Sequence, residues 1–538
     1  MDRRLSLKTL GLAAAGAPLA AKALVVPFGY APRNYAGVVP EVYAPVPRPP
    51  AYTSTIIIGS GFGAAVSALR LAQAGIESTI LERGFQWPND PNRDIFTQDT
   101  LPDGRGFWFR DSSKTLFGLP GTPIDRFAGV MDVTEYDHID VWRGACVGGG
   151  SVVFTGAMPQ PTRTNFDAIF QGKVDYDEMN AVFYPRVRQM LGLSPMPADI
   201  YNSAPFGHSR RWDVSARRAG YTPRPVEGIW NWDVVRAELN NTSRDSCTVG
   251  RSNLGNSNGA KFDLNQNYLR QAKATGKAKI FAGHEVRNIY FDGSRYVVDT
   301  VKLHPTGVIL DRYTITADRL VMAAGSIGTS ELLVRARATG GLPQLNEFVG
   351  GGWGSNGDSA VARSLAFSTG VTTGSACASM IGDQVSGMPV TLENWYAPGV
   401  PVNLGMDASL GMVMDLKSRA DFVYDPSTDK VRLNWPANGN DAAVAATRWM
   451  NNRIAAANFS LPGIPLIVKD VSAGFTAHPL GGMVLGKATD NFGRVKGYNG
   501  LYVMDGAAIP GSTGAVNPSL TISALAERNI AAIIKAGG

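Results

Sequence analysis

The residues best suited to do chemistry lie near the C-terminal end of the chain. His478 stands in the loop Ala477-His478-Pro479-Leu480-Gly481-Gly482, and Asn517 stands in Gly514-Ala515-Val516-Asn517-Pro518. The chain has only five histidines, and an imidazole can accept or donate a proton near neutral pH. A histidine held in a loop between proline and glycine residues is therefore a candidate catalytic residue, and we pair it with Asn517. An apolar strand, 501–504, and a helix, 520–528, are the elements expected to position them.

The N-terminal part carries the elements that would position a nucleotide. Residues 55–58 form a β-branched run typical of a strand buried on both faces. The turn Gly59-Ser60-Gly61-Phe62-Gly63-Ala64, a helical segment at 65–74 and a second strand at 78–82 follow. Gly59 permits the tight turn, Gly61 lets the backbone approach a pyrophosphate, and Ala64 is small enough for helix–strand packing. Glu82, at the end of the second strand, can accept hydrogen bonds from ribose hydroxyls. We therefore predict dinucleotide binding rather than an ordinary glycine-rich turn.

Composition narrows the class of protein. The 538 residues are 44% hydrophobic and 18% charged with a net charge of +6, which is typical of a soluble chain of two or three domains. Lysine and arginine are not interleaved with aromatic residues, so nucleic-acid binding is not expected. The three cysteines, Cys146, Cys247 and Cys377, form no C-x-x-C pair, so we expect free thiols. No histidine–cysteine cluster has the spacing of a metal site, and we expect no structural metal.

The N-terminus has the features of an export signal. Arg3-Arg4 precede a stretch of small and apolar residues at 10–21, and Ala21-Lys22-Ala23 offers a cleavage site. The stretch is too short to span a bilayer and fits a signal-peptide core. The paired arginines indicate the twin-arginine route, which exports folded proteins. We expect a signal peptide at 1–23, a proline-rich spacer at 24–50 and a secreted or periplasmic protein; the alternative is an amphipathic N-terminal helix.

Several further segments are expected to surround a site. The run Gly148-Gly149-Gly150-Ser151 predicts backbone lying against something flat or anionic, or else a flexible loop. A strand at 319–322 and a helix at 329–338 form a second strand–loop–helix passage. Short strand-like segments within 350–460 suggest a separate sheet in an inserted domain. Apolar loops at 107–121 and 459–468 are either packed on the core or mobile lids.

Together these features resemble the glucose–methanol–choline (GMC) family of flavoproteins, and within it the bacterial cholesterol oxidases that hold FAD non-covalently. The similarity covers nearly all of the chain after residue 50 and is strongest at 331–337, 478–490 and 517–529. It implies an α/β (α+β overall) fold: a Rossmann-like FAD-binding domain with an inserted substrate-binding domain built on a mostly antiparallel sheet. We assign the discontinuous FAD-binding domain to 51–90, 140–160, 258–350 and 470–538, and the steroid-binding domain with its lid loops to 91–139, 161–257 and 351–469.

The resemblance also implies roles for single residues. His478 would meet the steroid hydroxyl and take or share its proton, and Asn517 would stabilise charge beside the flavin ring. Glu393 falls where the family places its isomerisation base, and a carboxylate in an apolar sterol cavity has a raised pKa. The residues expected to bind FAD are Gly59, Gly61, Gly63, Glu82, Gly148, Gly149, Gly150, Ser151, Val286, Asp505, Gly506 and Asn517.

The activity implied is oxidation of a steroid 3β-hydroxyl to a ketone, with O2 reduced to H2O2 and the Δ5 double bond moved to Δ4. The expected partners are the steroid, O2 and a membrane surface touched transiently by a monomer. Two alternatives remain open. One is a flavin alcohol dehydrogenase for another bulky alcohol with a non-oxygen acceptor. It is favoured by Phe154 and Ser519, which replace an asparagine and a phenylalanine of the sterol oxidases. The other is a steroid-binding flavoprotein without catalysis.

Overall fold

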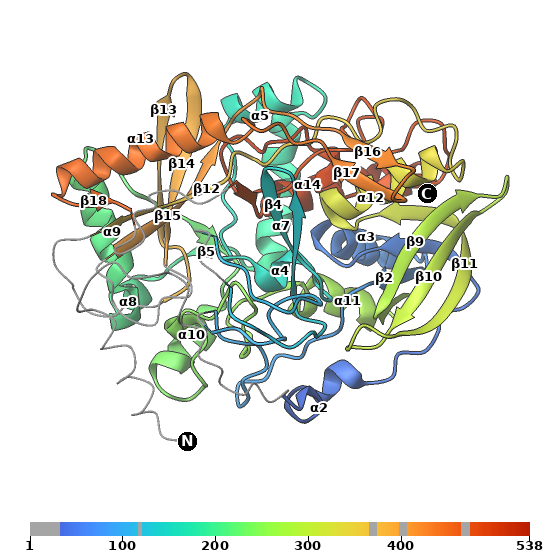
Figure 1. The fold of residues 1–538 in the computed structure, drawn as a ribbon, viewed down its shortest axis with the longest axis horizontal. Helices are drawn as coiled ribbons and strands as arrows, with labels where there is room; N and C mark the ends of the chain where they lie inside the picture. Colours follow the sequence, from blue (N-terminus) through green and yellow to red (C-terminus); the bar gives the residue numbers. More distant parts are fainter. Residues whose placement is uncertain are drawn as a thin grey trace. The chain divides into compact units, whose positions relative to one another are not determined.

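Two large sheets of different strand direction organise residues 36–538 of the computed structural model, which form one compact unit (Figure 1). The structure describes residues 33–99, 101–116, 121–364, 374–396, 406–463 and 474–537. The expected signal peptide at 1–23 and part of the spacer lie outside the described residues, as do parts of both apolar loops. No helix among the described residues is long and apolar enough to cross a membrane.

The first sheet has seven strands and a parallel centre. Its order is β8-β2-β1-β11-β10-β9, and β20 pairs with β11. Strands β8, β2, β1, β11 and β20 run parallel, whereas β10 is antiparallel to both β11 and β9. Ile56 to Ile58 are buried, as expected for a strand covered on both faces. The strands are β1 Tyr52–Ile58, β2 Ser78–Glu82, β8 Ala278–Ala282, β9 His284–Phe291, β10 Tyr296–Leu303, β11 Ile309–Met322 and β20 Leu501–Val503.

The glycine-rich turn leads into one of the helices that pack on this sheet. Helix α3 (Phe62–Gln73) follows the turn and packs against α11 (Tyr268–Ala274) and α14 (Ser519–Lys535). Gly63 has no room for a side chain, because an added Cβ would collide with the carbonyl oxygen of Met504. The close packing predicted for Ala64, which is fully buried, thus also depends on Gly63. Helix α12 (Gly325–Ala338) begins directly after β11 and packs against β9.

The second sheet has six strands in the order β18-β12-β15-β14-β13-β6, and all its pairs are antiparallel. Helices α9 (Gly207–Arg218) and α13 (Asp441–Ala457) cover one face through residues such as Trp212 and Met450 (Figure 1). Side chains alternate along each strand, so Ala360, Trp395 and Leu410 form an apolar cluster on the other face. The strands are β6 Arg224–Pro225, β12 Ser359–Ser364, β13 Ser379–Val385, β14 Met388–Trp395, β15 Met406–Val413 and β18 Leu461–Pro462.

A smaller sheet lies next to the His478 loop. Strands β3 (Met131–Tyr136) and β4 (Ile139–Gly144) form a hairpin, and β19 (Phe475–Thr476) pairs with β4. The proposed domain boundary at residue 140 falls inside this hairpin. The remaining described elements are α2 Tyr35–Val38, α4 Gly150–Val153, α5 Arg163–Phe170, α6 Tyr176–Glu178, α7 Tyr184–Leu191, α8 Ala198–Tyr201, α10 Trp232–Leu239, β5 Ser194–Pro195, β7 Glu227–Gly228, β16 Phe422–Asp425 and β17 Lys430–Leu433.

The mixed α/β fold with a second, antiparallel sheet confirms the predicted fold class. The segment 261–274 is not one continuous helix, because Asp263 caps a short 3-10 turn and Asn267 then interrupts the helical backbone before α11. In the described part of the first apolar loop Phe107 is buried, whereas Trp108, Phe109 and Leu116 are only half-buried. The three cysteines are free and buried, as predicted.

Candidate active site

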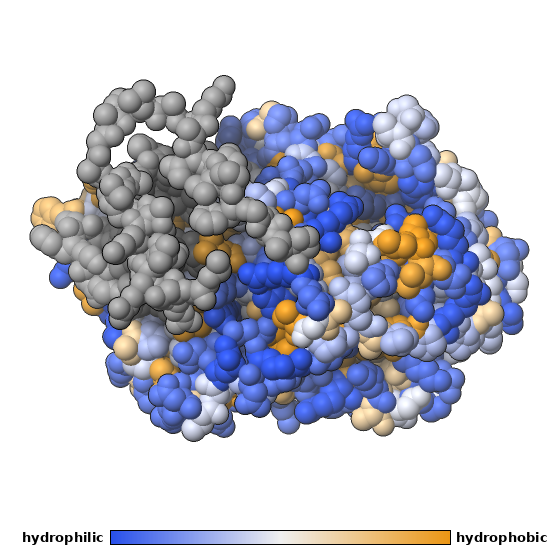
Figure 2. Space-filling view, turned by 60° about the horizontal axis from the view of Figure 1, so that its bottom comes forward, coloured by the Kyte–Doolittle hydropathy of each residue, from blue (hydrophilic) through white to orange (hydrophobic). Residues whose placement is uncertain are grey.

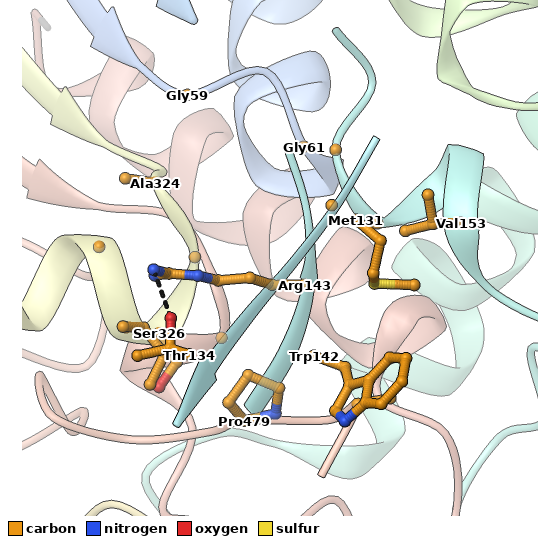
Figure 3. A pocket seen from close by; sticks show the side chains of 18 of the residues that line it. Gly59, Gly61, Met131, Thr134, Trp142, Arg143, Val153, Ala324, Ser326 and Pro479 are labelled. Atoms are coloured by element: carbon orange, nitrogen blue, oxygen red, sulfur yellow. Dashed lines mark hydrogen bonds between the residues drawn. The ribbon is translucent and has the colours of Figure 1, made fainter. Parts of the chain in front are cut away.

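A cavity of about 1380 Å³ is lined by residues of both large sheets and of the β3–β4 hairpin. In Figure 3 the Gly59–Gly61 turn lies on one side of it, and Trp142 and Pro479 lie on the other. Its volume exceeds the usual range for a single drug-sized ligand, about 300–1,000 Å³. The cavity therefore has room for a nucleotide cofactor together with a substrate.

Glu82 lies at the nucleotide end, as the spacing predicted. Its Oε2 accepts a hydrogen bond from Ser60 Oγ at 2.6 Å, and its Oε1 accepts one from Gly84 N at 2.8 Å. Burial raises the pKa of Glu82, and these hydrogen bonds partly oppose the rise. Each carboxylate oxygen keeps a lone pair for a ribose hydroxyl. Val286 also lines this end of the cavity.

The cavity has features that fit the diphosphate of a dinucleotide. Helices α3 and α12 both begin beside it, with no side-chain cap and no acidic residue in the first turn. The positive dipole ends of both helices favour phosphate, although the backbone N–H of Gly325 in α12 already donates to Asp505. An added Cβ at Gly61 would meet nothing within 4 Å, so a side chain there would enter open space. The residues at this position therefore fit the cofactor that the sequence implied.

Two further cofactor candidates surround the same space. Asp505 and Gly506 line the cavity, and Asp505 accepts hydrogen bonds from Thr329 Oγ1 at 2.5 Å and Ala507 N at 2.9 Å. Burial raises the pKa of Asp505 to about 6. These contacts hold the carboxylate at the cavity wall and partly oppose the rise in its pKa.

The glycine run contributes only its central residues to the cavity. Gly149 and Gly150 line it, whereas Gly148 and Ser151 do not. Ser151 Oγ donates to Gly148 O at 2.8 Å and accepts from Leu264 N at 3.1 Å, and Gly148 N donates to Ser60 Oγ at 3.1 Å. These two residues therefore shape the loop rather than face a ligand, because their polar groups are bound within the protein.

His478 forms a buried pair with Asp358, which immediately precedes β12. His478 Nδ1 lies 2.8 Å from Asp358 Oδ1, and His478 lines the cavity. Asp358 Oδ2 accepts hydrogen bonds from Ala477 N at 3.0 Å and Thr476 Oγ1 at 2.9 Å. Burial lowers the pKa of His478, but the charge and hydrogen bond of Asp358 outweigh it, so the pKa is raised overall.

Glu393 and Asn517 form a second buried pair. Asn517 Nδ2 donates to Glu393 Oε2 at 3.3 Å. Glu393 Oε1 and Asn517 Oδ1 are buried without a hydrogen-bond partner in the part of the chain that the structure describes. Burial raises the pKa of Glu393 to about 7, although the charge of His478 and the Asn517 hydrogen bond oppose the rise. The raised pKa expected for Glu393 is thus present.

The tertiary structure brings His478, Glu393 and Asn517 close together, but they do not share one wall. His478 lines the cavity, whereas Glu393 and Asn517 do not; their neighbours Trp395, Pro518 and Ser519 do. The turn that contains Asn356 holds two of these segments together. Asn356 Nδ2 donates to Val516 O at 2.9 Å, and Thr513 N donates to Asn356 Oδ1 at 2.9 Å. This turn fixes the segment preceding β12, which carries Asp358, against the Asn517 loop.

The wall beside the second sheet is apolar. Strand residues at alternate positions face the cavity, and Glu393 lies opposite Leu410 in the β14–β15 register. Phe154 and Ser519 also line the cavity. Such a wall suits a hydrophobic substrate. It is formed by Leu116, Trp142, Trp395, Met406, Ala408, Leu410 and Phe475.

Sequence reasoning missed Asp358 and Arg143. Arg143 lines the cavity and donates to Thr134 Oγ1 at 2.9 Å (Figure 3). It also donates to Asp132 Oδ2 at 3.1 Å. Its position five residues before the glycine run was a signal for a charged group near the cofactor. Asp358 follows an Asn-Gly turn before a strand, but its partner His478 is 120 residues away. No local pattern could connect them.

Models of protein families identify the class of enzyme. The models described as GMC oxidoreductase match residues 55–342 and 416–526, and the model of a GMC oxidoreductase C-terminal region matches 356–461. The first match alone covers more than half of the chain. This chain belongs to the GMC oxidoreductase family. The protein is therefore a flavin oxidoreductase that acts on alcohols, and the family implies FAD as its cofactor.

Individual relatives agree with this assignment. Cholesterol oxidase of Mycobacterium tuberculosis (strain ATCC 25618 / H37Rv) is 27% identical over 555 residues, covering 88% of this chain and 89% of the relative. Cholesterol oxidase of Acinetobacter baumannii is 24% identical over 545 residues, covering 88% and 93%. The crystal structure of pyridoxine 4-oxidase from Mesorbium loti has a TM-score of 0.60 at 16% identity and covers 90% of this chain and 99% of that chain. This last likeness shows the fold.

Proposed function

We propose that this GMC oxidoreductase is an exported, FAD-dependent 3β-hydroxysteroid oxidase that also isomerises its product. The observation that carries the proposal is the buried His478–Glu393 cluster beside an apolar cavity wall. A steroid needs such a wall for its rings and one polar point for its hydroxyl. The similarity to two cholesterol oxidases over most of the chain supports the same substrate class.

In the proposed oxidation, His478 receives the hydroxyl proton. Asp358 occupies the Nδ1 side of the ring, and Nε2 makes no hydrogen bond with any described residue. The alcohol O–H bond breaks and an Nε2–H bond forms, while the carbon gives up its hydrogen as hydride and becomes a carbonyl carbon. FAD, when bound, would supply the hydride acceptor, and O2 would be the final oxidant, reduced to H2O2.

Glu393 is the proposed base for moving the double bond from Δ5 to Δ4. A carboxylate with a pKa of about 7 exists in both protonation states near neutrality, which suits taking a proton from one carbon and returning it to another. Glu393 is on the same face of the sheet as Trp395 and its register partner Leu410, which line the cavity, but Glu393 itself does not line it. Isomerisation is therefore the step that a substitution tests most directly.

We further propose that FAD is held non-covalently. Cys146 is the one thiol beside the glycine run, and its buried sulfur donates to Gly149 O. Burial raises the pKa of this thiol well above its usual value, so it is a poor nucleophile for attachment to a cofactor. Acid precipitation of the holoenzyme should therefore release all of the flavin into the supernatant.

Contact with a membrane is proposed from the end of α13. Phe459 is 94% exposed and Leu461 is 74% exposed, which is unusual for large apolar side chains in adjacent turns. On the face in Figure 2, other hydrophobic residues form separate patches among hydrophilic ones. We therefore propose a monomer that touches a sterol-bearing membrane briefly with this tip.

The decisive experiment is aerobic turnover of cholesterol by the purified yellow protein, following H2O2 and the conjugated enone together. Both products should appear in equal amounts. Peroxide without enone would remove isomerisation from the proposal. Neither product, with FAD bound, would exclude the steroid oxidase.

The second candidate is a flavin alcohol dehydrogenase with a non-oxygen acceptor. It is favoured by Phe154 and Ser519, which both line the cavity and differ from the residues expected in a sterol oxidase. A turnover rate supported by a quinone and unchanged by removing O2 would favour it. A rate that depends on O2 would exclude it.

A further inference from the structure

The hydrogen-bonding groups around Asp358 hold its carboxylate in one orientation. Ala477 N donates to Oδ2, and a backbone N–H cannot accept in return. Thr476 Oγ1 accepts from His478 N at 2.8 Å and lies 2.9 Å from the same Oδ2. The Oδ1 atom is thus left to face His478 Nδ1 at 2.8 Å. The carboxylate is buried, so no bulk water competes for it.

This arrangement selects one tautomer of the neutral imidazole. A carboxylate oxygen that accepts a hydrogen bond requires the proton on Nδ1. The other nitrogen, Nε2, is then unprotonated on the side of the ring away from Asp358. A neutral imidazole with the proton on Nε2 would place two acceptors 2.8 Å apart, which is repulsive in a buried site.

We propose that Asp358 is a positioning residue for alcohol oxidation: it keeps the proton of neutral His478 on Nδ1, so that Nε2 accepts the substrate proton, and it stabilises the imidazolium that forms. This inference rests on the role proposed above for His478. Asp358 takes no proton in this scheme. The hydroxyl O–H bond breaks, the Nε2–H bond forms, and hydride leaves the carbon for FAD.

The charged groups around His478 define how the pair responds to pH. Asp358 faces it from the segment before β12, and Glu393 faces it from β14. The thiol of Cys377 is also near Glu393: burial, and then the charge of Glu393, raises its pKa. Since Asp358 favours the charged imidazole, His478 loses its proton only above its ordinary pKa. The oxidation rate should therefore rise with pH through a point above 6.5.

Asp358→Asn is the sharpest test because the surroundings dictate how an amide would sit. Ala477 N needs an acceptor, so the amide oxygen takes the Oδ2 place and the NH2 group faces Nδ1. That NH2 group can only donate, so Nδ1 becomes an acceptor and the proton moves to Nε2. The variant should keep its KM within a few-fold while kcat falls on the order of 10²–10⁴-fold. The acidic limb of its rate profile should move to lower pH.

The direct readout is the tautomer, measured by NMR on holoenzyme with 15N-labelled histidine. With five histidines in the chain, the His478 signals are assigned by their loss in His478→Gln. At pH values above the rise in oxidation rate, the wild type should show a protonated Nδ1 and an unprotonated Nε2. Asp358→Asn should show the reverse. A wild type with the proton on Nε2 would overturn the proposal even if no variant folds.

Asp213→Asn is the matched control. Asp213 is also buried in the second domain, where Tyr201 and Ser379 donate to its carboxylate. The same chemical change there should leave the His478 tautomer unchanged. The double variant Asp358→Asn/His478→Gln should be no slower than His478→Gln alone, because Asp358 acts through His478. Additive losses would contradict the proposal.

The two proposals fail in different ways. If cholesterol is not oxidised but the tautomer reverses in Asp358→Asn, the steroid oxidase is wrong and the positioning role stands for another alcohol. If cholesterol is oxidised normally by Asp358→Asn, the positioning role is wrong and the steroid oxidase stands.

Discussion

At the scale of single residues, the site is a concentration of buried ionisable groups. Asp358, His478 and Glu393 lie together in an interior where an unpaired charge is strongly disfavoured. Asp358 is stabilised by three donors, but Glu393 has one weak partner and one oxygen without any described partner. Glu393 therefore has the less favourable environment for its charge. A group held in such an environment is a candidate for function.

Glu393→Gln should separate the two proposed reactions. The amide keeps the size of the side chain but cannot take a proton from carbon. We expect peroxide formation from cholesterol within a few-fold of the wild type and loss of enone formation by at least about 10²-fold. Simultaneous assays of H2O2 and enone measure this directly. Unchanged enone formation would assign the isomerisation to another group or to solvent.

The same substitution should change stability in a pH-dependent way. The pKa of Glu393 is raised from 4.5 to about 7, so folding favours its neutral form. This contribution is fully present below pH 4.5 and is lost as pH rises through about 7. Wild type should therefore lose about 3 kcal/mol relative to Glu393→Gln across this range. Thermal unfolding of both proteins at pH 5 and pH 8 tests the sign, and parallel curves would contradict the raised pKa.

At the scale of elements, the turn between β1 and α3 serves two purposes that its glycines separate. Gly63 faces the backbone of Met504, whereas Gly61 faces open space in the cavity. The first glycine allows the helix to pack close to the chain that enters Asp505. The second leaves room for a cofactor phosphate near the helix N-terminus.

Gly61→Ala and Gly63→Ala form a matched pair. Gly63→Ala should destabilise the apoprotein by about 3 kcal/mol or more, because the methyl group collides with main chain. Gly61→Ala should leave the thermal unfolding of the apoprotein nearly unchanged and weaken FAD binding at least about tenfold. Flavin fluorescence titration measures the affinity. Normal FAD affinity in folded Gly61→Ala would place the diphosphate elsewhere.

The end of α13 offers a second prediction at this scale. Replacing Phe459 and Leu461 by serine should slow oxidation of cholesterol embedded in vesicles by about tenfold, because less apolar surface enters the bilayer. Oxidation of cholesterol in detergent micelles should be unaffected. Replacing Val423, which is 47% exposed in β16, by serine is the control. Equal losses in vesicles and micelles would show that the tip acts on the catalytic site instead.

At the scale of the whole molecule, the catalytic cluster exists because two sheets and three loops meet. Asp358 comes from the segment before β12, Glu393 from β14, His478 from the loop after β19, and Asn517 from the segment before α14. The first sheet positions the nucleotide end, and the second supplies the apolar wall. A protein of this kind needs both sheets folded around FAD before it works, which agrees with the proposed export in a folded state.

Replacing Arg3-Arg4 by Lys-Lys should keep the protein in the cytoplasm with its flavin bound. The paired arginines are what the twin-arginine route reads, whereas folding and FAD loading depend on residues after 50. Cell fractionation with flavin quantification measures both. Lys8→Arg should be exported as the wild type. Export of the Lys-Lys protein would mean that another route or another segment directs it.

The sequence by itself determined the features whose parts are neighbours along the chain. The strand–turn–helix–strand at 52–82 was predictable because a buried strand, glycines and small helical residues follow one another within it. The loops around His478 and Asn517 stood out for the same local reason, and family resemblance added Glu393. Residue periodicity also indicated a second sheet.

Only the tertiary structure decided which side chains meet. The Asp358–His478 pair joins residues 120 positions apart, and the Asn517–Glu393 contact joins residues 124 apart. It also showed that Gly148, Ser151 and Glu393 do not line the cavity. Local patterns report propensity and burial, whereas a hydrogen bond of 2.8 Å depends on how separate sheets pack. Which atoms of the site carry protons therefore depends on that packing.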